Sequence, residues 1–447
     1  DYATTSSDTN SSKTRAYVKW DVTRVVTKWY EEHRTTGAME LSYYNPNQYK
    51  RATVFLGYDP DVPAYLMVAY RNNVGIEPYY TYQGMGAGNA GTAYISDYSG
   101  QLTVAKSLVS YASGINPFHL QLVFNSAYFA NRSTGVEKMY DLCQEIGLGM
   151  HTGSGVTYSM IQQVKEEVLG EEYADKDTPV ENREYIRYLD GDGTIHYFAK
   201  QEKTSGDYKA GLYYDEDGLG LKIEKKDGKH IMSDDKDNKK VFVNGFLRYT
   251  EDANGNKIRY YYVTDSNSTP GDPAASGSRI TKITQQNNGG EEIEVARLTY
   301  ASHTLSAGRT EANYLNTIKD YAGTTYQLHY TSGKLTSIDR DGTPLVSYTM
   351  RMNGTLALNQ LNAMTDLEDG YTLSFTYENG RVSSVEESKG EETGARIEIQ
   401  TTQDRGTVYR DTGADRISGT QDDILTYYAF DYAGRTVNAY TTDWKDH

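Results

Sequence analysis

Hydrophobic and polar residues alternate along much of the chain, and this alternation predicts β-strands. Tyr326, Leu328 and Tyr330, for example, fall on every second position, so an extended backbone would place all three on one face. Between such stretches, Asp, Asn or Ser often precedes Gly, and these pairs supply the positive φ that a tight hairpin turn requires. The pattern therefore predicts short antiparallel hairpins.

The hairpin pattern recurs along the chain. LNTIKDYAGTTYQLHYTSGKLTSI aligns with LNAMTDLEDGYTLSFTYENGRVSSV, so that Leu315 matches Leu361, 46 positions later, and Tyr330 matches Tyr377, 47 positions later. One inserted residue near Gly370 accounts for the change of offset. Looser copies of the turn occur in YTEDANGNKIRYYY and FDYAGRTVNAY, and degenerate copies in YLDGDGTIHYF and YYDEDGLGLKI. Since one hairpin cannot bury its apolar face alone, the copies are expected to stack side by side into a long sheet.

The residues of these turns are the expected structural sites of the chain. An acidic residue opens the turn, Gly takes the left-handed position, and Asn or Arg follows. The positions predicted to hold the hairpin turns are Asp252, Gly255, Asn256, Asp320, Gly323, Gly333, Gly380, Asp431, Gly434 and Arg435.

The front of the chain has a different pattern. Residues 16–20 read as a strand, and the hydrophobic residues from Val22 to Trp29 have helical spacing after Asp21 or Thr23 as a cap. The Gly-rich stretch GMGAGNAG, residues 84–91, is expected to be a hinge. It lacks the GKS or GKT of a phosphate-binding loop, which disfavours nucleotide binding. DDKDNKK is expected to be a polar loop.

The composition agrees with a β protein that has many turns. The 447 residues include 42 Tyr but only 9 Phe and 3 Trp, together with 41 Gly and 9 Pro. Tyr favours strands and carries a hydrogen-bonding tip on an apolar ring. A chain of this length is too long for one ordinary core, which favours several domains or one large repetitive sheet.

The charge argues against several classes of partner. A net charge of −16, with only short basic runs, disfavours nucleic acid, because a phosphate backbone calls for clustered Lys and Arg. No stretch of about 20 apolar residues predicts a membrane span. The single cysteine, Cys143, excludes a disulfide framework and is expected to be a small buried hydrophobe. The polar opening without a signal peptide suggests a piece of a longer protein.

The sequence carries no clear enzymatic motif. It has no G-x-S-x-G elbow, and its eight His residues form no HExxH pair. A triad that converges only in space stays open. With 61 acidic residues, pairs of carboxylates at catalytic separation arise by chance and discriminate nothing. We therefore predict that the chain is not an enzyme.

Two binding sites are weighed against structural roles. Asp411, Asp415, Asp422 and Asp423 are candidate calcium ligands, with DGDG at residues 190–193 and DEDG at 215–218 as weaker ones. None has EF-hand spacing, and Asp-Gly is also what a hairpin turn requires. Trp20 and Trp29 are candidates for stacking on sugar rings, although their spacing also suits a core. No other cofactor is predicted.

The turn Phe430-Asp431-x-x-Gly434-Arg435 resembles the centre of the YD repeat, which defines the RHS family. The stretch AYISDYSGQLTVAKSLVSYASGINPFHLQLVFNS is similar to the segment that opens the RHS region. GSGVTYSMIQQV is similar to the next family block, with Val156 where Trp is usual.

The front of the chain, residues 16–70, resembles the C-terminal half of a DNRLRE-type β-sandwich, through Trp20-Asp21-Val22-Thr23, the Val-x-x-Trp that ends at Trp29, and Ala64-Tyr65-Leu66. The predicted domains are thus a partial sandwich at 1–83, the opening RHS segment at 84–180 and the hairpin repeats at 181–447.

The resemblance implies an all-β fold in which stacked antiparallel hairpins form a spiral or partly closed β-shell. It also implies a non-enzymatic, secreted or cell-surface structural protein of bacteria, as part of a larger polymorphic-toxin-like or wall-associated protein. Full-length members often enclose a C-terminal toxin that is released by self-cleavage near an Asp-Pro-x-Gly-Leu motif, which this sequence lacks.

The partners implied are the rest of the same polypeptide, a toxin cargo, or cell-wall glycan. Self-assembly through unpaired sheet edges is a further expectation. The alternatives kept are a carbohydrate-binding adhesin, a subunit of an extracellular assembly, and a glycan-active enzyme.

Overall fold

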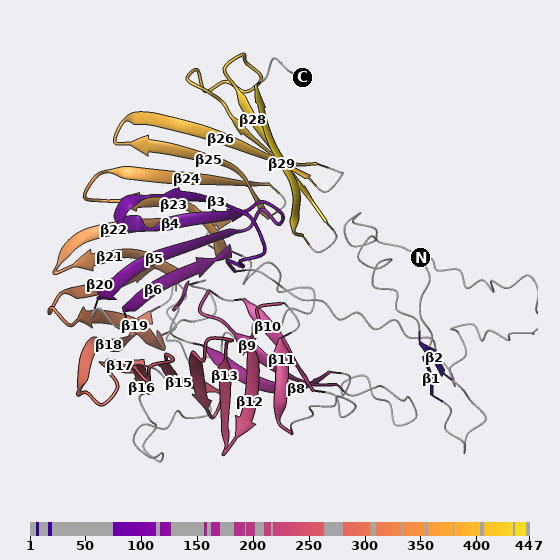
Figure 1. The fold of residues 1–447 in the computed structure, drawn as a ribbon. Coiled ribbons are helices and arrows are strands. Elements are labelled where there is room, and N and C mark those ends of the chain that lie inside the picture. The colour runs from indigo at the N-terminus through magenta and orange to yellow at the C-terminus, as the bar shows by residue number, and fades with distance from the viewer. Residues whose placement is uncertain are drawn as a thin grey trace, which may run out of the picture.

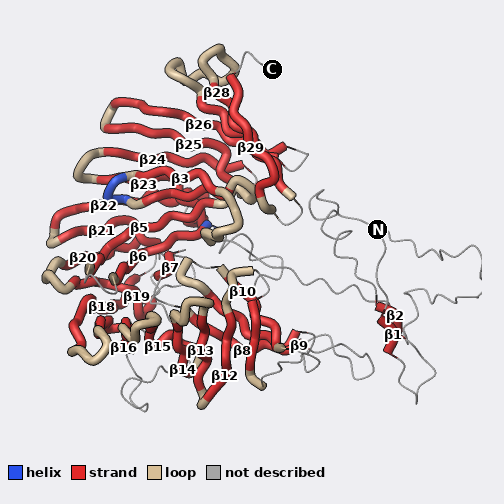
Figure 2. Tube along the Cα trace, viewed as in Figure 1, coloured by secondary structure: helices blue, strands red, loops and turns tan. Residues whose placement is uncertain are grey.

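In the computed structural model, nearly all of the regular secondary structure in the described residues is β-strand. Besides Ser126, the described helical residues form the 3-10 turn η1 (Gly88–Ala90) (Figure 2). The predicted all-β fold of antiparallel hairpins is therefore confirmed. The described residues are 6–8, 17–19, 75–112, 117–126, 156–158, 162–169, 183–192, 194–201, 210–215, 218–262, 280–304, 310–331, 334–353, 356–378, 380–402, 406–431 and 434–443.

A single antiparallel sheet of 22 strands, the outer sheet, contains most of the described residues (Figure 1). Each strand pairs with its neighbours in the sequence, so the sheet grows hairpin by hairpin. Its first strands are β8 (Gln163–Leu169), β9 (Arg183–Leu189), β10 (Ile195–Lys200), β11 (Leu212–Asp215), β12 (Lys222–Lys226), β13 (Lys229–Ser233), β14 (Lys239–Val243) and β15 (Phe246–Glu251).

The later strands of the outer sheet are longer on average and carry the sequence repeats. They are β16 (Lys257–Tyr262), β17 (Ile280–Gln286), β18 (Glu292–Thr304), β19 (Thr310–Asp320), β20 (Thr325–Thr331), β21 (Lys334–Arg340), β22 (Thr343–Asn353), β23 (Leu356–Asp366), β24 (Tyr371–Glu378), β25 (Arg381–Lys389), β26 (Glu392–Thr402), β27 (Gly406–Asp411), β28 (Ile424–Phe430) and β29 (Thr436–Asp443).

The outer sheet curls back on itself at its start. Gln163 of β8 pairs with Phe246 of β15. On either side of this pair, the amide of Val164 donates to the carbonyl of Gly245 at 2.9 Å and the amide of Leu247 donates to the carbonyl of Gln162 at 3.2 Å. From β15 the sheet continues through β16 to β29, which pairs with β28. The sheet as a whole is therefore not closed.

A second sheet of five strands, the inner sheet, packs against the outer sheet (Figure 1). Its strands are also in sequence order: β3 (Tyr82–Gly86), β4 (Thr92–Ser96), β5 (Leu102–Tyr111), β6 (Phe118–Asn125) and β7 (Val156–Tyr158).

The expected hinge at residues 84–91 is wrong, because these residues lie inside the inner sheet. They form the end of β3, the turn η1 and the approach to β4. Gly88 and Gly91 adopt φ values of +52° and +110°, which glycine reaches without strain. The glycines thus make a tight turn between two strands.

The remaining two described strands, β1 (Ser6–Asp8) and β2 (Tyr17–Lys19), pair with each other. Apart from β2, the residues that resemble the DNRLRE sandwich up to position 70 lie outside the described part. Trp20, Trp29 and the expected helix are among them. In the described residues, no helix has the length and apolar character that a membrane crossing requires.

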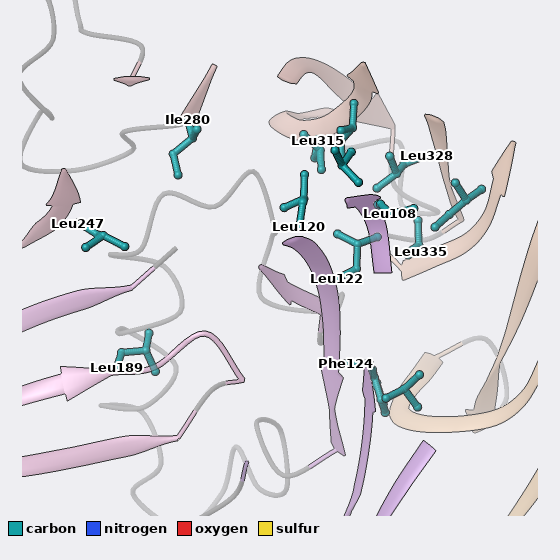
Figure 3. Close-up of a cluster of buried hydrophobic side chains, with 14 of the residues drawn as sticks. Leu108, Leu120, Leu122, Phe124, Leu189, Leu247, Ile280, Leu315, Leu328 and Leu335 are labelled. Atoms are coloured by element: carbon teal, nitrogen blue, oxygen red, sulfur yellow. The ribbon is translucent and has the colours of Figure 1, made fainter. Parts of the chain in front are cut away.

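Part of the hydrophobic core lies between the two sheets. Leu108, Leu120 and Leu122 of the inner sheet point toward Leu315 and other leucines of the outer sheet (Figure 3). All of these side chains are buried, as the alternation along the strands predicts. Burying one such leucine stabilises the fold by about 1.5–3 kcal/mol, so these apolar contacts help to hold the two sheets together.

Candidate functional site: the repeated turns and the contacts between the sheets

The loop that Asp252 opens illustrates the repeated turn. One oxygen of its carboxylate accepts the amides of Asn254 and Asn256, each at 2.9 Å, and the other oxygen accepts the side-chain amide of Asn256 at 2.7 Å. Gly255 has a φ of +84° and donates its amide to the carbonyl of Asp252 at 3.0 Å. These bonds satisfy the backbone of a three-residue hairpin loop whose third residue is left-handed.

Asp320 and Asp431 open loops of the same geometry. The carboxylate of Asp320 accepts the amide of Thr324 at 2.9 Å, and the carboxylate of Asp431 accepts the amide of Arg435 at 2.9 Å. Gly323 and Gly434 take φ values of +94° and +80°. Arg435 also pairs with Asp431 through its guanidinium at 2.7 Å.

One loop of this kind was not predicted from the sequence and lies in the stretch DDKDNKK, which was expected only to be a polar loop. Asp234 accepts the amides of Lys236 and Asn238 at 2.8 and 2.9 Å and the side-chain amide of Asn238 at 2.8 Å. Asp237 takes the left-handed position with a φ of +61°. The sequence signal for this loop was Asn238, because it follows Asp234 at the same spacing at which Asn256 follows Asp252.

The tips of neighbouring hairpins also bind each other. The side-chain oxygen of Asn256 accepts the amide of Asn288 at 2.9 Å, and the side chain of Asn288 donates to the carbonyl of Asn254 at 2.9 Å. Asn256 is only 3% exposed. The residue after the glycine therefore links two turns as well as closing its own.

Two-residue turns form a second class. In Asp227–Gly228, Asn244–Gly245 and Asp341–Gly342 both residues have positive φ, as a type I′ hairpin turn requires. Gly380, with a φ of +81°, lies in the short turn between β24 and β25. Gly333, its predicted counterpart, lies outside the described residues.

Tyrosine hydroxyls join neighbouring strands of the outer sheet. Tyr262, Tyr330 and Tyr377 each donate to the carbonyl of a leucine in an earlier strand, at 2.7, 2.9 and 2.8 Å. Those carbonyls belong to Leu247, Leu315 and Leu361 respectively. Burial is the main cause that raises the pKa of Tyr262 and Tyr377, so both hydroxyls keep their proton as donors.

Each of these tyrosines directly follows a break in strand register. The shifts fall between Tyr261 and Tyr262, between His329 and Tyr330, and between Thr376 and Tyr377. A bulge re-aims the following side chain, which here is turned toward the carbonyl of the earlier strand. This recurring bond gives the abundant tyrosine of the sequence a structural role.

Asp366 has a different role from its sequence equivalent, Asp320. The insertion before Gly370 enlarges its loop, and its carboxylate accepts the amide of Asn89 at 2.7 Å and that of Glu368 at 3.0 Å. Asn89 belongs to η1 of the inner sheet, and Asp366 is 1% exposed. A Cβ at Gly88 would collide with this carboxylate. At this position of the repeat, the aspartate thus forms a hydrogen bond between the two sheets.

A second set of polar bonds joins the sheets near the turn that follows β4. The amide of Val382 donates to the carbonyl of Gly100 at 2.8 Å, and the hydroxyl of Thr407 donates to the carbonyl of Asp97 at 2.6 Å. The side chain of Gln83 donates to the carboxylate of Asp97 and to the hydroxyl of Tyr428, both at 3.0 Å. These bonds position the inner sheet relative to β25, β27 and β28.

A buried polar cluster fixes the segment that precedes β3. The amide of Ile76 donates to the carboxylate of Asp192 at 2.6 Å, and Glu77 lies 3.5 Å from His196 Nε2. Glu77 and His196 are 4% and 1% exposed. Asp192, in the turn between β9 and β10, and His196 of β10 therefore hold this segment through their polar side chains. Around it, Tyr188 contacts Gln162, Asp190 and Lys240 at 2.6, 2.9 and 2.8 Å.

The acids of this cluster differ in their electrostatics. Burial raises the pKa of Glu77, against the attraction of His196. Burial and the neighbouring charge of Asp190 raise the pKa of Asp192. Burial also opposes the charge of Asp190, but the Lys240 ammonium and backbone donation hold the pKa of this carboxyl below its usual value. Asp190 is thus the member that carries the negative charge most readily.

The candidate calcium residues lie in the loop between β27 and β28. Asp411, Asp415 and Asp422 accept backbone amides within the loop at 3.1, 2.8 and 2.8 Å. Asp423 accepts the amide of Gly419 and the guanidinium of Arg410, both at 2.8 Å. Across the described part of the chain, no three His, Cys, Asp or Glu side chains are placed to hold a metal ion. The structure uses these carboxylates to hold the loop.

The comparisons with known proteins yield only distant structural matches. No family model matches the chain, and neither does any curated protein. Solved structures similar to it include the crystal structure of TcdB2-TccC3, at 11% identity and a TM-score of 0.25, where the match covers 76% of this chain and 20% of that one. Another is the Tc holotoxin pore of Photorhabdus luminescens, at 11% identity and a TM-score of 0.20, covering 79% of this chain and 25% of that one. The chain thus spans about a quarter or less of these structures.

Proposed function

We propose that this chain is a non-enzymatic structural part of a bacterial protein that is secreted or displayed at the cell surface, and that its hairpins build the wall of a β-shell. The observation that carries the proposal is the outer sheet of 22 strands, packed along one face on an inner sheet. Such a sheet forms a broad, rigid wall, because each strand is hydrogen-bonded to its neighbours and the apolar face packs on the core.

The last strand supports a role within a larger polypeptide or complex. β29 pairs with β28, and in it Val437 is 64% exposed and Tyr440 is 52% exposed. An exposed strand at the end of a sheet offers unpaired amides and carbonyls to a further strand. This edge suits continuation by another hairpin, from the same polypeptide or from a partner.

A shell predicts enclosed cargo, and protease protection tests this. The gene is read beyond the codon for His447, and the chain is expressed together with the segment that follows. We expect the segment to resist protease in the intact protein and to be cleaved when it is expressed alone.

Equal cleavage in both forms would contradict the shell, as would a stop codon directly after His447 for the version with a downstream toxin. The adhesin alternative predicts binding on a glycan array. Binding that is lost in Trp20→Ala and Trp29→Ala variants would favour the adhesin over the shell.

A further inference from the structure

Lys106 interrupts the apolar face of the inner sheet. On β5 the residues that point to the core fall on every second position: Leu102, Val104, Lys106 and Leu108. Lys106 is 6% exposed, although lysine is rarely buried without a partner. The alternation along β5 therefore places the amine of Lys106 on the face that packs against the outer sheet.

The amine has no direct partner there. Among the described residues, the structure records neither a hydrogen bond nor an ion pair for Lys106. The charged groups that face it are Asp366, Glu368 and Arg340. Asp366 is bonded to Asn89, and Glu368 pairs with Arg340. Both nearby carboxylates are thus engaged elsewhere.

The side chain lines a small cavity between the sheets. Val104 and Leu122 of the inner sheet and Met350 and Leu361 of the outer sheet form part of its apolar wall. Its volume is about 20 Å³, which suits a molecule of roughly the size of water. Burial, partly opposed by Asp366, lowers the pKa of Lys106 to about 8. A desolvated lysine of this kind is a nucleophile, because much more of it is unprotonated near neutral pH.

We propose that Lys106 is a reactive amine that captures small carbonyl compounds as an imine. The lone pair of Nζ attacks the carbonyl carbon and forms a C–N bond. Both protons of the neutral amine then leave with the carbonyl oxygen as water, and a C=N bond remains. The size of the cavity restricts the site to the smallest aldehydes, of the formaldehyde class.

The test uses the full chain with a low dose of formaldehyde and cyanoborohydride at pH 7, which reduces any imine to a stable methylated lysine. Peptide mass spectrometry then gives the labelling rate of each lysine. We expect Lys106 to be labelled at least tenfold faster than Lys229, which is exposed. The label at this position should be absent in Lys106→Met.

Lys334 is the matched control. It is 5% exposed and burial lowers its pKa to about 8, but it does not line the cavity. Fast labelling of Lys106 and slow labelling of Lys334 would support the cavity as the source of reactivity. Labelling of Lys106 no faster than that of Lys229, in protein with unchanged circular dichroism, would overturn the proposal. Equal, fast labelling of both buried lysines would also overturn it, because burial alone would then suffice.

Discussion

The hairpins of the outer sheet and the strands of the inner sheet are held by different kinds of contact. In the outer sheet, Asp320 closes a loop with Thr324, four residues away, and Tyr330 reaches a strand 15 residues back. In the inner sheet, Asn89 binds Asp366, which is 277 residues away. The hairpins are thus stabilised mainly by contacts between residues close in the sequence, whereas the position of the inner sheet depends on partners that are distant in the sequence.

The contrast is sharpest at two equivalent positions of the repeat. Asp320 and Asp366 align in the sequence, yet one closes its own loop and the other binds the inner sheet. The difference follows from one inserted residue, which enlarges the loop and redirects the carboxylate. A repeat can therefore gain a tertiary role by a small local change.

The largest expected effect is the loss of apolar contact between the sheets. Leu120 is 0% exposed and packs toward Leu315, so Leu120→Ala should lower the free energy of unfolding by about 2–5 kcal/mol. Urea unfolding measures this. Ile293→Ala in the outer sheet is the control, since Ile293 is 46% exposed and should cost less than about 0.5 kcal/mol. Similar losses in both variants would contradict the packing described for the inner sheet.

The next effect has the opposite sign and depends on pH. The pKa of Lys106 falls from 10.5 to about 8 on folding, so the unfolded chain binds this proton more tightly. The destabilisation of the folded state by the buried ammonium is fully present below pH 8, and it disappears as the pH rises to about 10.5. Lys106→Met should therefore raise the free energy of unfolding by about 2–3 kcal/mol at pH 7. The gain should shrink at pH 9.5, as measured by urea unfolding.

Exposed Lys229→Met is the control for this pH dependence, and its unfolding midpoint should stay close to that of the parent at both values. A Lys106→Met variant that is less stable at pH 7 would mean that the amine has a stabilising partner in the folded chain.

A smaller difference should separate the two aspartates. Asp366→Ala removes a buried carboxylate that accepts the amides of Asn89 and Glu368, and it should cost about 2 kcal/mol, whereas Asp320→Ala should cost about 1 kcal/mol. The regions of faster hydrogen exchange should also differ between the two variants. It should rise across the inner sheet for Asp366→Ala and only around residues 320–324 for Asp320→Ala. The same local pattern in both variants would remove the distinction.

The smallest effect is that of one tyrosine hydroxyl. Tyr330→Phe removes the bond to the carbonyl of Leu315 and should cost about 1 kcal/mol. Tyr321→Phe is the control, because Tyr321 is 57% exposed and should be neutral within about 0.5 kcal/mol. If both changes are neutral in urea unfolding, the recurring tyrosine bond does not stabilise the hairpin stack.

The sequence alone was enough to predict the all-β fold and the stacking of hairpins. Alternation and Asp-x-x-Gly turns act over a few residues, and the structure places Asp252, Asp320 and Asp431 at hairpin loops. Two loops were not predicted correctly from local patterns. The Asp234 loop has Asp237 where glycine is usual, and Gly88 belongs to a turn within the inner sheet and not to a hinge.

Only the tertiary structure decided how the two sheets meet. The sequence does not show that Asp366 binds Asn89, that Glu77 faces His196, or that Lys106 lies in a cavity between the sheets. Each of these contacts joins residues far apart in the chain, and the direction of each side chain depends on bulges and insertions that change the register. Short-range patterns therefore specify the hairpins, while long-range packing specifies where the polar groups of the two sheets converge.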